Sequence, residues 1–153
     1  MDRTALIALY RDGHAEVVRA LDCAIDQELD RRPGEGCWTA REVVHHLADS
    51  ETTSFIRLRK LVAEDHPTIE AYNENLYALR NHYQRPIETS LAVLAAVRSS
   101  SAELLDDLSD AEWTRTGTHS QTGSYSLDFW LTLYAEHAHD HADQIRRARR
   151  GER

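Results

Sequence analysis

The stretch SLDFWLTLYAEHAHDHADQIRRARR, residues 126–150, decides the fold of this chain. Apolar side chains recur in it every three to four positions, which is the spacing of one face of an α-helix. The stretch ends in a cluster of arginines, and cations are favourable at a helix C-terminus. We expect one helix from about residue 126 to 150. Its inward face should contain Trp130, Leu133, Tyr134, Ile145 and Ala148.

Three further helices are expected before it, separated by glycine and proline. The first should run from about residue 2 to 29. The second starts at a capping box formed by Thr39 and Glu42 and continues to about residue 63. The third follows Pro86 and extends to about residue 105. This pattern predicts an all-α protein, an antiparallel four-helix bundle with one longer crossover, in a single domain over residues 1–153.

The segments between the long helices are less regular. Residues 68–80 show a mixed pattern that predicts a short helix or an ordered crossover. Ser109 and Glu112 form a second capping box, which predicts a short turn around Trp113. Residues 114–125 are polar and rich in glycine, serine and threonine, so we expect a loop there.

Composition excludes several classes of protein. The chain carries 26 acidic and 18 basic residues, a net charge of −8, and such a surface repels the phosphates of nucleic acids. No apolar run reaches the length of a membrane span, and the first residues lack the apolar segment of a signal peptide. Cys23 and Cys37 fit neither a disulfide framework nor a CxxC motif, as is usual in the reducing cytoplasm. We expect a cytoplasmic protein that acts on a small molecule.

Nine histidines are many for a chain of this length, and two of them carry the functional argument. His137 and His141 are four residues apart, so they lie on one face of the last helix, the apolar face. Two imidazoles at this spacing commonly bind a metal ion. The alternative is that both are core histidines bonded to buried partners. The pairing on an apolar face favours the metal.

A tight site needs a third ligand. His46 lies at the edge of the apolar stripe of the second helix, whereas His45 lies among polar residues, so we choose His46. His139 should point to solvent, because it lies about 200° around the helix from His137. His119, in the predicted loop, could reach the mouth of the pocket. The remaining histidines are expected at the surface: His14, His66 and His82.

The predicted ligand set indicates the kind of metal. Neutral imidazoles suit one divalent transition metal such as zinc, nickel, copper or iron, whereas magnesium and calcium prefer oxygen. Three protein ligands also leave one coordination position open for water or a substrate atom, as in catalytic sites. No catalytic Ser-His-Asp set, phosphate-binding loop or dinucleotide fingerprint is present to indicate another chemistry.

The motifs resemble those of the DinB/YfiT superfamily. The resemblance rests on the segments WTAREVVHHLADS (residues 38–50), FIR (55–57) and DHPTI (65–69) with Tyr72, and on LYAEHAHDH (133–141) with Ile145. It is closest to the YfiT branch, whose members are called metal-dependent hydrolases and bacillithiol S-transferases. The resemblance covers most of the chain between residues 34 and 145. Two positions beside the ligands depart from the usual family pattern, Glu136 and Asp140.

The resemblance implies a fold and a chemistry. It places the family's three metal ligands on His46, His137 and His141, and it implies an antiparallel four-helix bundle that is often a homodimer. Zinc or nickel is the expected metal, and a low-molecular-weight thiol such as bacillithiol, mycothiol or glutathione is the expected cosubstrate. The implied reaction is transfer of this thiol to an electrophilic small molecule. Two alternatives stay open: a metal-dependent hydrolase that uses water, and a non-catalytic, stress-related metal-binding protein.

Overall fold

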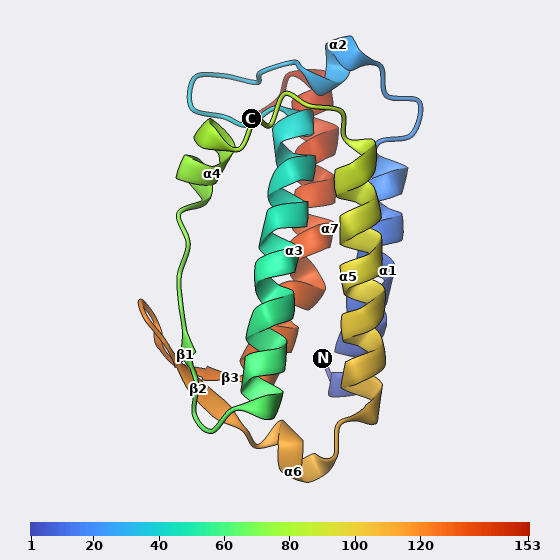
Figure 1. The fold of residues 1–153 in the computed structure, drawn as a ribbon. Coiled ribbons are helices and arrows are strands. Elements are labelled where there is room, and N and C mark those ends of the chain that lie inside the picture. The colour runs from blue at the N-terminus through green and yellow to red at the C-terminus, as the bar shows by residue number, and fades with distance from the viewer.

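The computed structural model describes all residues, 1–153, and confirms the four-helix bundle. The long helices are α1 (Arg3–Ala20), α3 (Ala40–Ala63), α5 (Glu88–Asp107) and α7 (Leu127–Arg150). Figure 1 shows them side by side, with α1 and α7 running in one direction and α3 and α5 in the other. Because α3 packs directly on α7, these two helices form an antiparallel pair. No helix is long and apolar enough to cross a membrane.

Local capping explains where the helices begin. Thr39 and Glu42 form the predicted capping box at the start of α3, each accepting a hydrogen bond from the other's backbone N–H. The Ser126 side chain accepts from the backbone N–H of Phe129 and so begins α7 at the predicted residue. At the other end of α7, Gly151 adopts a left-handed conformation with φ of 79°, which glycine tolerates without steric cost.

The predicted first helix, residues 2–29, is wrong beyond Ala20. The chain turns at Leu21 and continues as a separate short helix, α2 (Asp26–Leu29). The reason is a tertiary contact with the end of α7. The Arg149 guanidinium donates to the carbonyl oxygen of Ala20 at 2.7 Å and forms an ion pair with Glu28 at 2.7 Å. This side chain satisfies a carbonyl that the end of α1 leaves without a helical partner.

The crossover from α3 to α5 contains a short strand, β1 (Thr68–Ile69), and a short helix, α4 (Glu74–Arg80). The sequence predicted either a short helix or an ordered crossover here, and the segment contains both. In Figure 1 the crossover runs along the outside of the bundle from one end to the other. It therefore returns the chain to the end at which α3 began, so α5 runs in the same direction as α3.

The predicted loop at residues 114–125 is also wrong, because it forms a β-hairpin. After the capped turn α6 (Asp110–Trp113), β2 (Thr116–His119) pairs antiparallel with β3 (Gly123–Ser126) and parallel with β1. Every second residue of β2 faces inward, and from β3 the Tyr125 ring is buried. A half-buried strand is normally recognised by alternating apolar and polar residues. Because these strands contain glycine and serine in place of apolar residues, the sequence does not show that alternation.

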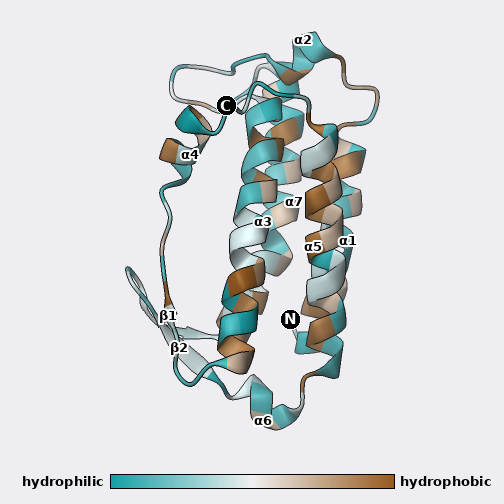
Figure 2. Ribbon diagram, in the orientation of Figure 1, coloured by the Kyte–Doolittle hydropathy of each residue, from teal (hydrophilic) through white to brown (hydrophobic).

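The apolar core consists of two clusters along the bundle. Figure 2 shows apolar and polar residues alternating along each long helix. One cluster gathers around Trp130 and Leu58, and the other around Val43, Leu47 and Ile145. The predicted inward position of Leu133 is wrong, since its side chain is 43% exposed. The buried positions nearby are alanines, which permit a close approach of α1 to α7: Ala135, Ala138 and Ala142.

A buried ion pair contributes a polar layer to this core. Arg98 Nη1 lies 2.7 Å from Glu51 Oε2, and the two residues are 2% and 0% exposed. The Tyr10 hydroxyl donates to the other Glu51 oxygen at 2.5 Å, and Arg98 Nε donates to the Tyr10 carbonyl at 3.0 Å. Because every partner is satisfied, the two charges tolerate burial.

Removing one charge of this pair should strongly destabilise the bundle. In Glu51→Ala the Arg98 guanidinium stays buried without its counter-charge, so we expect a loss of about 3–5 kcal/mol in the free energy of unfolding. The control is Asp106→Ala, which removes the exposed ion pair with Arg11 and should cost less than about 1 kcal/mol. Urea unfolding of both variants measures this. Equal losses would show that the buried pair has no special role.

Candidate metal centre

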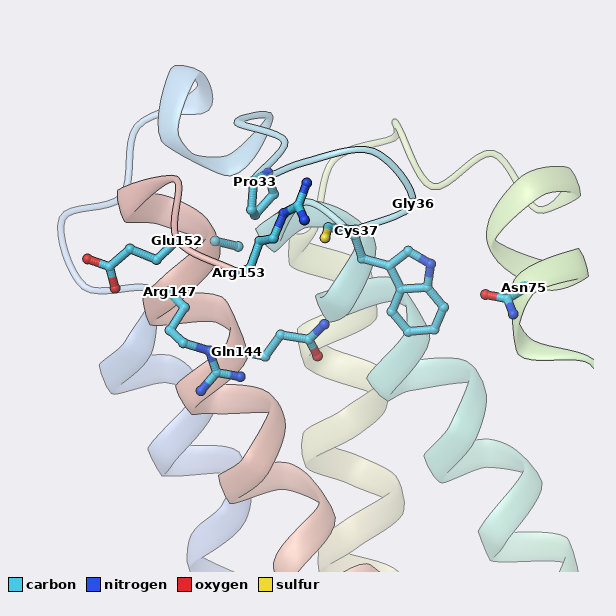
Figure 3. A pocket seen from close by; sticks show the side chains of 10 residues that line it. Pro33, Gly36, Cys37, Asn75, Gln144, Arg147, Glu152 and Arg153 are labelled. Atoms are coloured by element: carbon cyan, nitrogen blue, oxygen red, sulfur yellow. The ribbon is translucent and has the colours of Figure 1, made fainter.

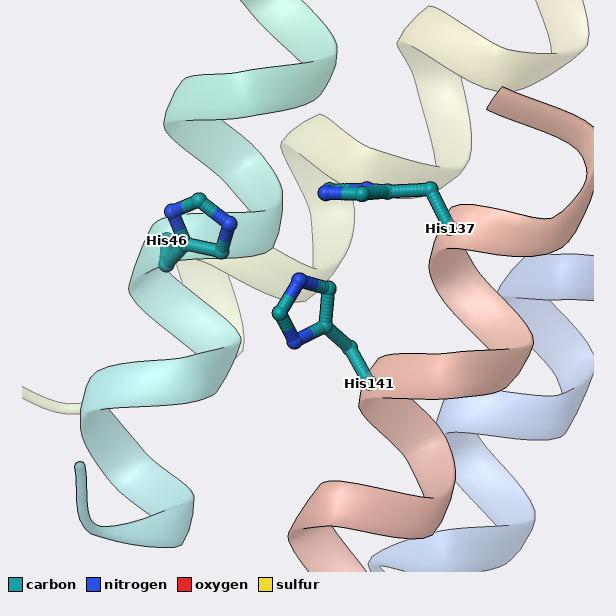
Figure 4. A group of neighbouring side chains, drawn as sticks. All are labelled: His46, His137 and His141. Atoms are coloured by element: carbon teal, nitrogen blue, oxygen red, sulfur yellow. The ribbon is translucent and has the colours of Figure 1, made fainter. Parts of the chain in front are cut away.

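Three histidines meet between α3 and α7. His46 comes from α3, and His137 and His141 come from successive turns of α7. The ring centroids lie 5.5 Å apart for His46 and His137, 4.8 Å for His46 and His141, and 4.5 Å for His137 and His141. One nitrogen from each ring lies within 4.8 Å of the other two. Figure 4 shows the rings turned toward one another across the gap between the two helices.

The unsatisfied polar atoms of these rings fit a bound metal ion. Buried polar side-chain atoms almost always have a hydrogen-bond partner. Only five in this protein have none, and three of them are His46 Nδ1, His46 Nε2 and His137 Nδ1. An ion bound between the rings would supply a partner for one nitrogen of each ring. The arrangement therefore argues against the alternative of ordinary core histidines, which would be bonded to buried groups.

Burial keeps all three rings neutral. It lowers the pKa of His46 to about 3, assisted by the neighbouring His141. It also lowers the pKa of His137 and of His141 below the usual histidine value. The neutral imidazole has the free lone pair that a metal ion requires. The pocket thus holds its histidines in the ligand form at neutral pH.

A second layer of residues orients the rings. His141 Nδ1 lies 2.6 Å from Gln144 Oε1; since an amide oxygen only accepts, Nδ1 donates and Nε2 is left free to bind an ion. The Trp38 ring packs on the His46 ring with centroids 4.7 Å apart. A carboxylate also lies near the triad: Glu74 Oε2, on α4, is 3.7 Å from His46 Nε2.

A cavity of about 300 Å³ adjoins the triad at the end of the bundle where α3 begins. Trp38 and Gln144, which contact His46 and His141, line it together with Cys37, Asn75 and Arg147. Figure 3 shows Gln144 and Asn75 on opposite sides of this cavity, with Cys37 above Gln144. A small molecule can therefore reach the neighbourhood of the histidines from this end.

Three other histidines lie outside the triad, and His139 does not point freely to solvent as expected. His45 is fully buried, and its ring nitrogens contact Ser90 Oγ at 2.8 Å and the Arg85 carbonyl at 2.9 Å. His139 is half-buried, since its Nε2 donates to the Leu9 carbonyl at 3.0 Å. His119 lies on β2, where its Nδ1 accepts from two backbone N–H groups, and it is not part of the triad.

A second group of potential ligands, Asp12, Glu16 and His139, is less suited to a metal ion. Arg19 forms ion pairs with both carboxylates, and Arg146 forms another with Glu16. These guanidinium groups already neutralise the acidic charge that would attract a cation.

The sequence analysis did not identify the residues that orient the triad. Gln144 could have been found, because it lies three residues after His141 on the same helix face.

Comparison with known proteins identifies the family. A sequence model of the DinB superfamily matches residues 9–145. The chain belongs to the DinB superfamily. A protein of Oceanobacillus iheyensis named "Putative metal-dependent hydrolase" is 38% identical over 120 residues, which cover 78% of this chain and 70% of that protein. A protein from Bacillus mycoides with the same descriptive name is 33% identical over 130 residues, covering 85% and 75%.

A solved structure supports the same assignment. YfiT from Bacillus subtilis superposes on this DinB-superfamily chain with a TM-score of 0.90 and 30% sequence identity. The match covers 98% of this chain and 89% of YfiT. YfiT is described as "a probable metal-dependent hydrolase with an unusual four-helix bundle topology". The family resemblance seen in the sequence is therefore confirmed, as is the bundle.

Replacing one triad histidine should remove the metal. In His141→Ala the site loses one of its three imidazoles, so we expect the affinity for zinc or nickel to fall more than about 100-fold. This loss exceeds the effect of removing a residue that only hydrogen-bonds to a metal ligand. Elemental analysis after dialysis measures the bound metal. His139→Gln, on the same helix but outside the triad, is the matched control and should keep about one ion per chain. Full occupancy in His141→Ala would refute the ligand assignment.

The depressed pKa values make a prediction for the metal-free protein. Between pH 6.5 and about 3 the unfolded chain protonates His46 while the folded chain does not. Stability should therefore fall with decreasing pH in this window, by up to about 1.4 kcal/mol per pH unit from this residue. Unfolding of His46→Gln in the presence of a chelator should show a shallower slope below pH 6.5. Parallel curves for the two proteins throughout would contradict the burial of a neutral ring.

Proposed function

We propose that this protein is a metal-dependent enzyme that transfers a low-molecular-weight thiol to an electrophilic small molecule. The observation that carries the proposal is the convergence of three neutral histidines, one buried and two half-buried, of which His46 and His137 have buried nitrogens without a hydrogen-bond partner. Zinc or nickel is the proposed metal. When bound, such an ion supplies a Lewis-acidic position at which a thiol loses its proton more readily.

The surrounding residues have defined roles in this proposal. His46, His137 and His141 hold the ion, and three protein ligands leave a position open. Gln144 fixes the ring orientation and tautomer of His141 through its hydrogen bond. Trp38 packs against the His46 ring between the triad and the cavity. Together these contacts preorganise the pocket before the substrate enters.

The reacting sulfur is proposed to come from the cosubstrate. The chain has only two cysteines, and neither belongs to the group of potential ligands. Cys23 is exposed, whereas Cys37 lines the cavity beside Trp38. Cys37 is therefore the protein thiol that an experiment must exclude as the nucleophile.

Hydrolysis is the second candidate. The names of the Oceanobacillus and Bacillus relatives favour it, and the same triad would serve if water occupied the open position in place of a thiol. A non-catalytic metal-binding role would require a closed site, for which Glu74 is the nearest further ligand. A homodimer and a cytoplasmic location remain predictions from the sequence.

Thiol-dependent turnover tests the proposal. Metal-loaded protein is incubated with an electrophile such as monochlorobimane, with and without bacillithiol or glutathione. We expect conjugation that requires both metal and thiol, falls more than about 100-fold in His141→Ala, and persists in the double variant Cys23→Ser, Cys37→Ser. Ester hydrolysis without thiol would favour the hydrolase instead. Loss of activity in a metal-loaded double variant would identify a protein cysteine as the nucleophile.

A further inference from the structure

Two buried polar atoms outside the triad also lack a hydrogen-bond partner. They are Arg57 Nε and the Tyr125 hydroxyl oxygen. The Tyr125 side chain is only 2% exposed, and its hydroxyl lies close to the Arg57 guanidinium and the Tyr134 hydroxyl. Leaving such groups without partners is costly unless something else binds there. The chain thus concentrates its unsatisfied buried polar side-chain atoms in two places, the triad and this cluster.

Arg57 brings an uncompensated positive charge to the cluster. Its Nη1 donates to the Tyr134 hydroxyl at 3.1 Å and its Nη2 donates to the Glu70 carbonyl at 2.7 Å, but it forms no ion pair. The nearby buried carboxylate, Glu51, is already paired with Arg98. Burial raises the pKa of both Tyr125 and Tyr134, so their hydroxyls remain protonated and able to donate.

The cluster adjoins the triad. Tyr134 lies one helical turn before His137 on α7, and the two ring centroids are 5.7 Å apart. Its hydroxyl contacts Arg57 from α3, the helix that also carries His46. The cluster therefore lies beside His137, about one helical turn along α7 from it.

We propose that Arg57, Tyr125 and Tyr134 form an anion-binding subsite that holds a carboxylate of the molecule whose other end reaches the metal. A guanidinium with free N–H groups and phenol donors matches the acceptor oxygens of a carboxylate and repels cations. The subsite rests on the proposed function, and it favours a thiol cosubstrate that carries a carboxylate.

Binding of two matched thiols tests the subsite. Cobalt(II) replaces the native metal, and the thiolate-to-cobalt charge-transfer band reports binding without catalysis. We expect 3-mercaptopropionate to bind about tenfold more tightly than its neutral analogue 3-mercaptopropionamide, the effect of one charge-assisted hydrogen bond of about 1.4 kcal/mol. Arg57→Gln should abolish this preference and leave the affinity for the amide unchanged, while Arg57→Lys should retain part of it.

Arg147→Gln is the control for charge. Arg147 lines the cavity on the other side of the triad and also forms no ion pair. Its substitution should leave the preference intact, and loss of the preference in Arg147→Gln but not in Arg57→Gln would overturn the proposal. A charge-transfer band with no preference for the acid would also overturn it, while leaving thiol binding at the metal in place.

If neither thiol gives a band, the proposed function fails, and thermal stabilisation decides the subsite alone. Succinate should then raise the melting temperature of the metal-loaded wild type but not of Arg57→Gln, and equal shifts would refute the subsite.

The variant Tyr125→Phe distinguishes a role in binding from a structural role. Because no hydrogen bond of good geometry holds this hydroxyl, its removal should cost the ligand-free fold little, yet it should weaken 3-mercaptopropionate binding several-fold. A destabilised variant with unchanged binding would contradict the proposal.

Discussion

The antiparallel packing of α3 on α7 is the constraint on which the rest of the structure depends. It places one histidine of α3 opposite two histidines on successive turns of α7, in a space from which water is largely excluded. Neither helix alone can assemble this set. The same packing desolvates the rings, and desolvation lowers their pKa values, so the folding that gathers the ligands also keeps them neutral.

The bundle balances its most deeply buried ion pair within the core. Glu51, five residues after His46 on α3, is paired with Arg98 and bonded to Tyr10. The triad differs, because buried ring nitrogens of His46 and His137 have no protein partner. A buried group that the protein leaves unsatisfied while satisfying its neighbours is most simply understood as a group that awaits a ligand. The same reasoning connects the triad to the cluster at Arg57.

The sequence predicted those features that depend on local spacing. The capping box at Thr39 and the i, i+4 pair at His137 and His141 depend on residues within one or two turns, and the structure has both. The features that the sequence did not predict depend on tertiary contacts. The break after Ala20 depends on Arg149, which is distant in the sequence, and the burial of His45 depends on Ser90 of α5. The Arg57 cluster was likewise hidden, because it joins side chains from separate elements.

The central claim is that the triad binds one metal ion and leaves it a position for an exchangeable ligand. X-ray absorption spectroscopy of the zinc-loaded protein, before and after addition of a thiol, tests this most directly. The account predicts imidazole nitrogens at about 2.0–2.1 Å and, after the thiol is added, one new sulfur at about 2.3 Å. A site that is fully coordinated by protein ligands and unchanged by the thiol would contradict it.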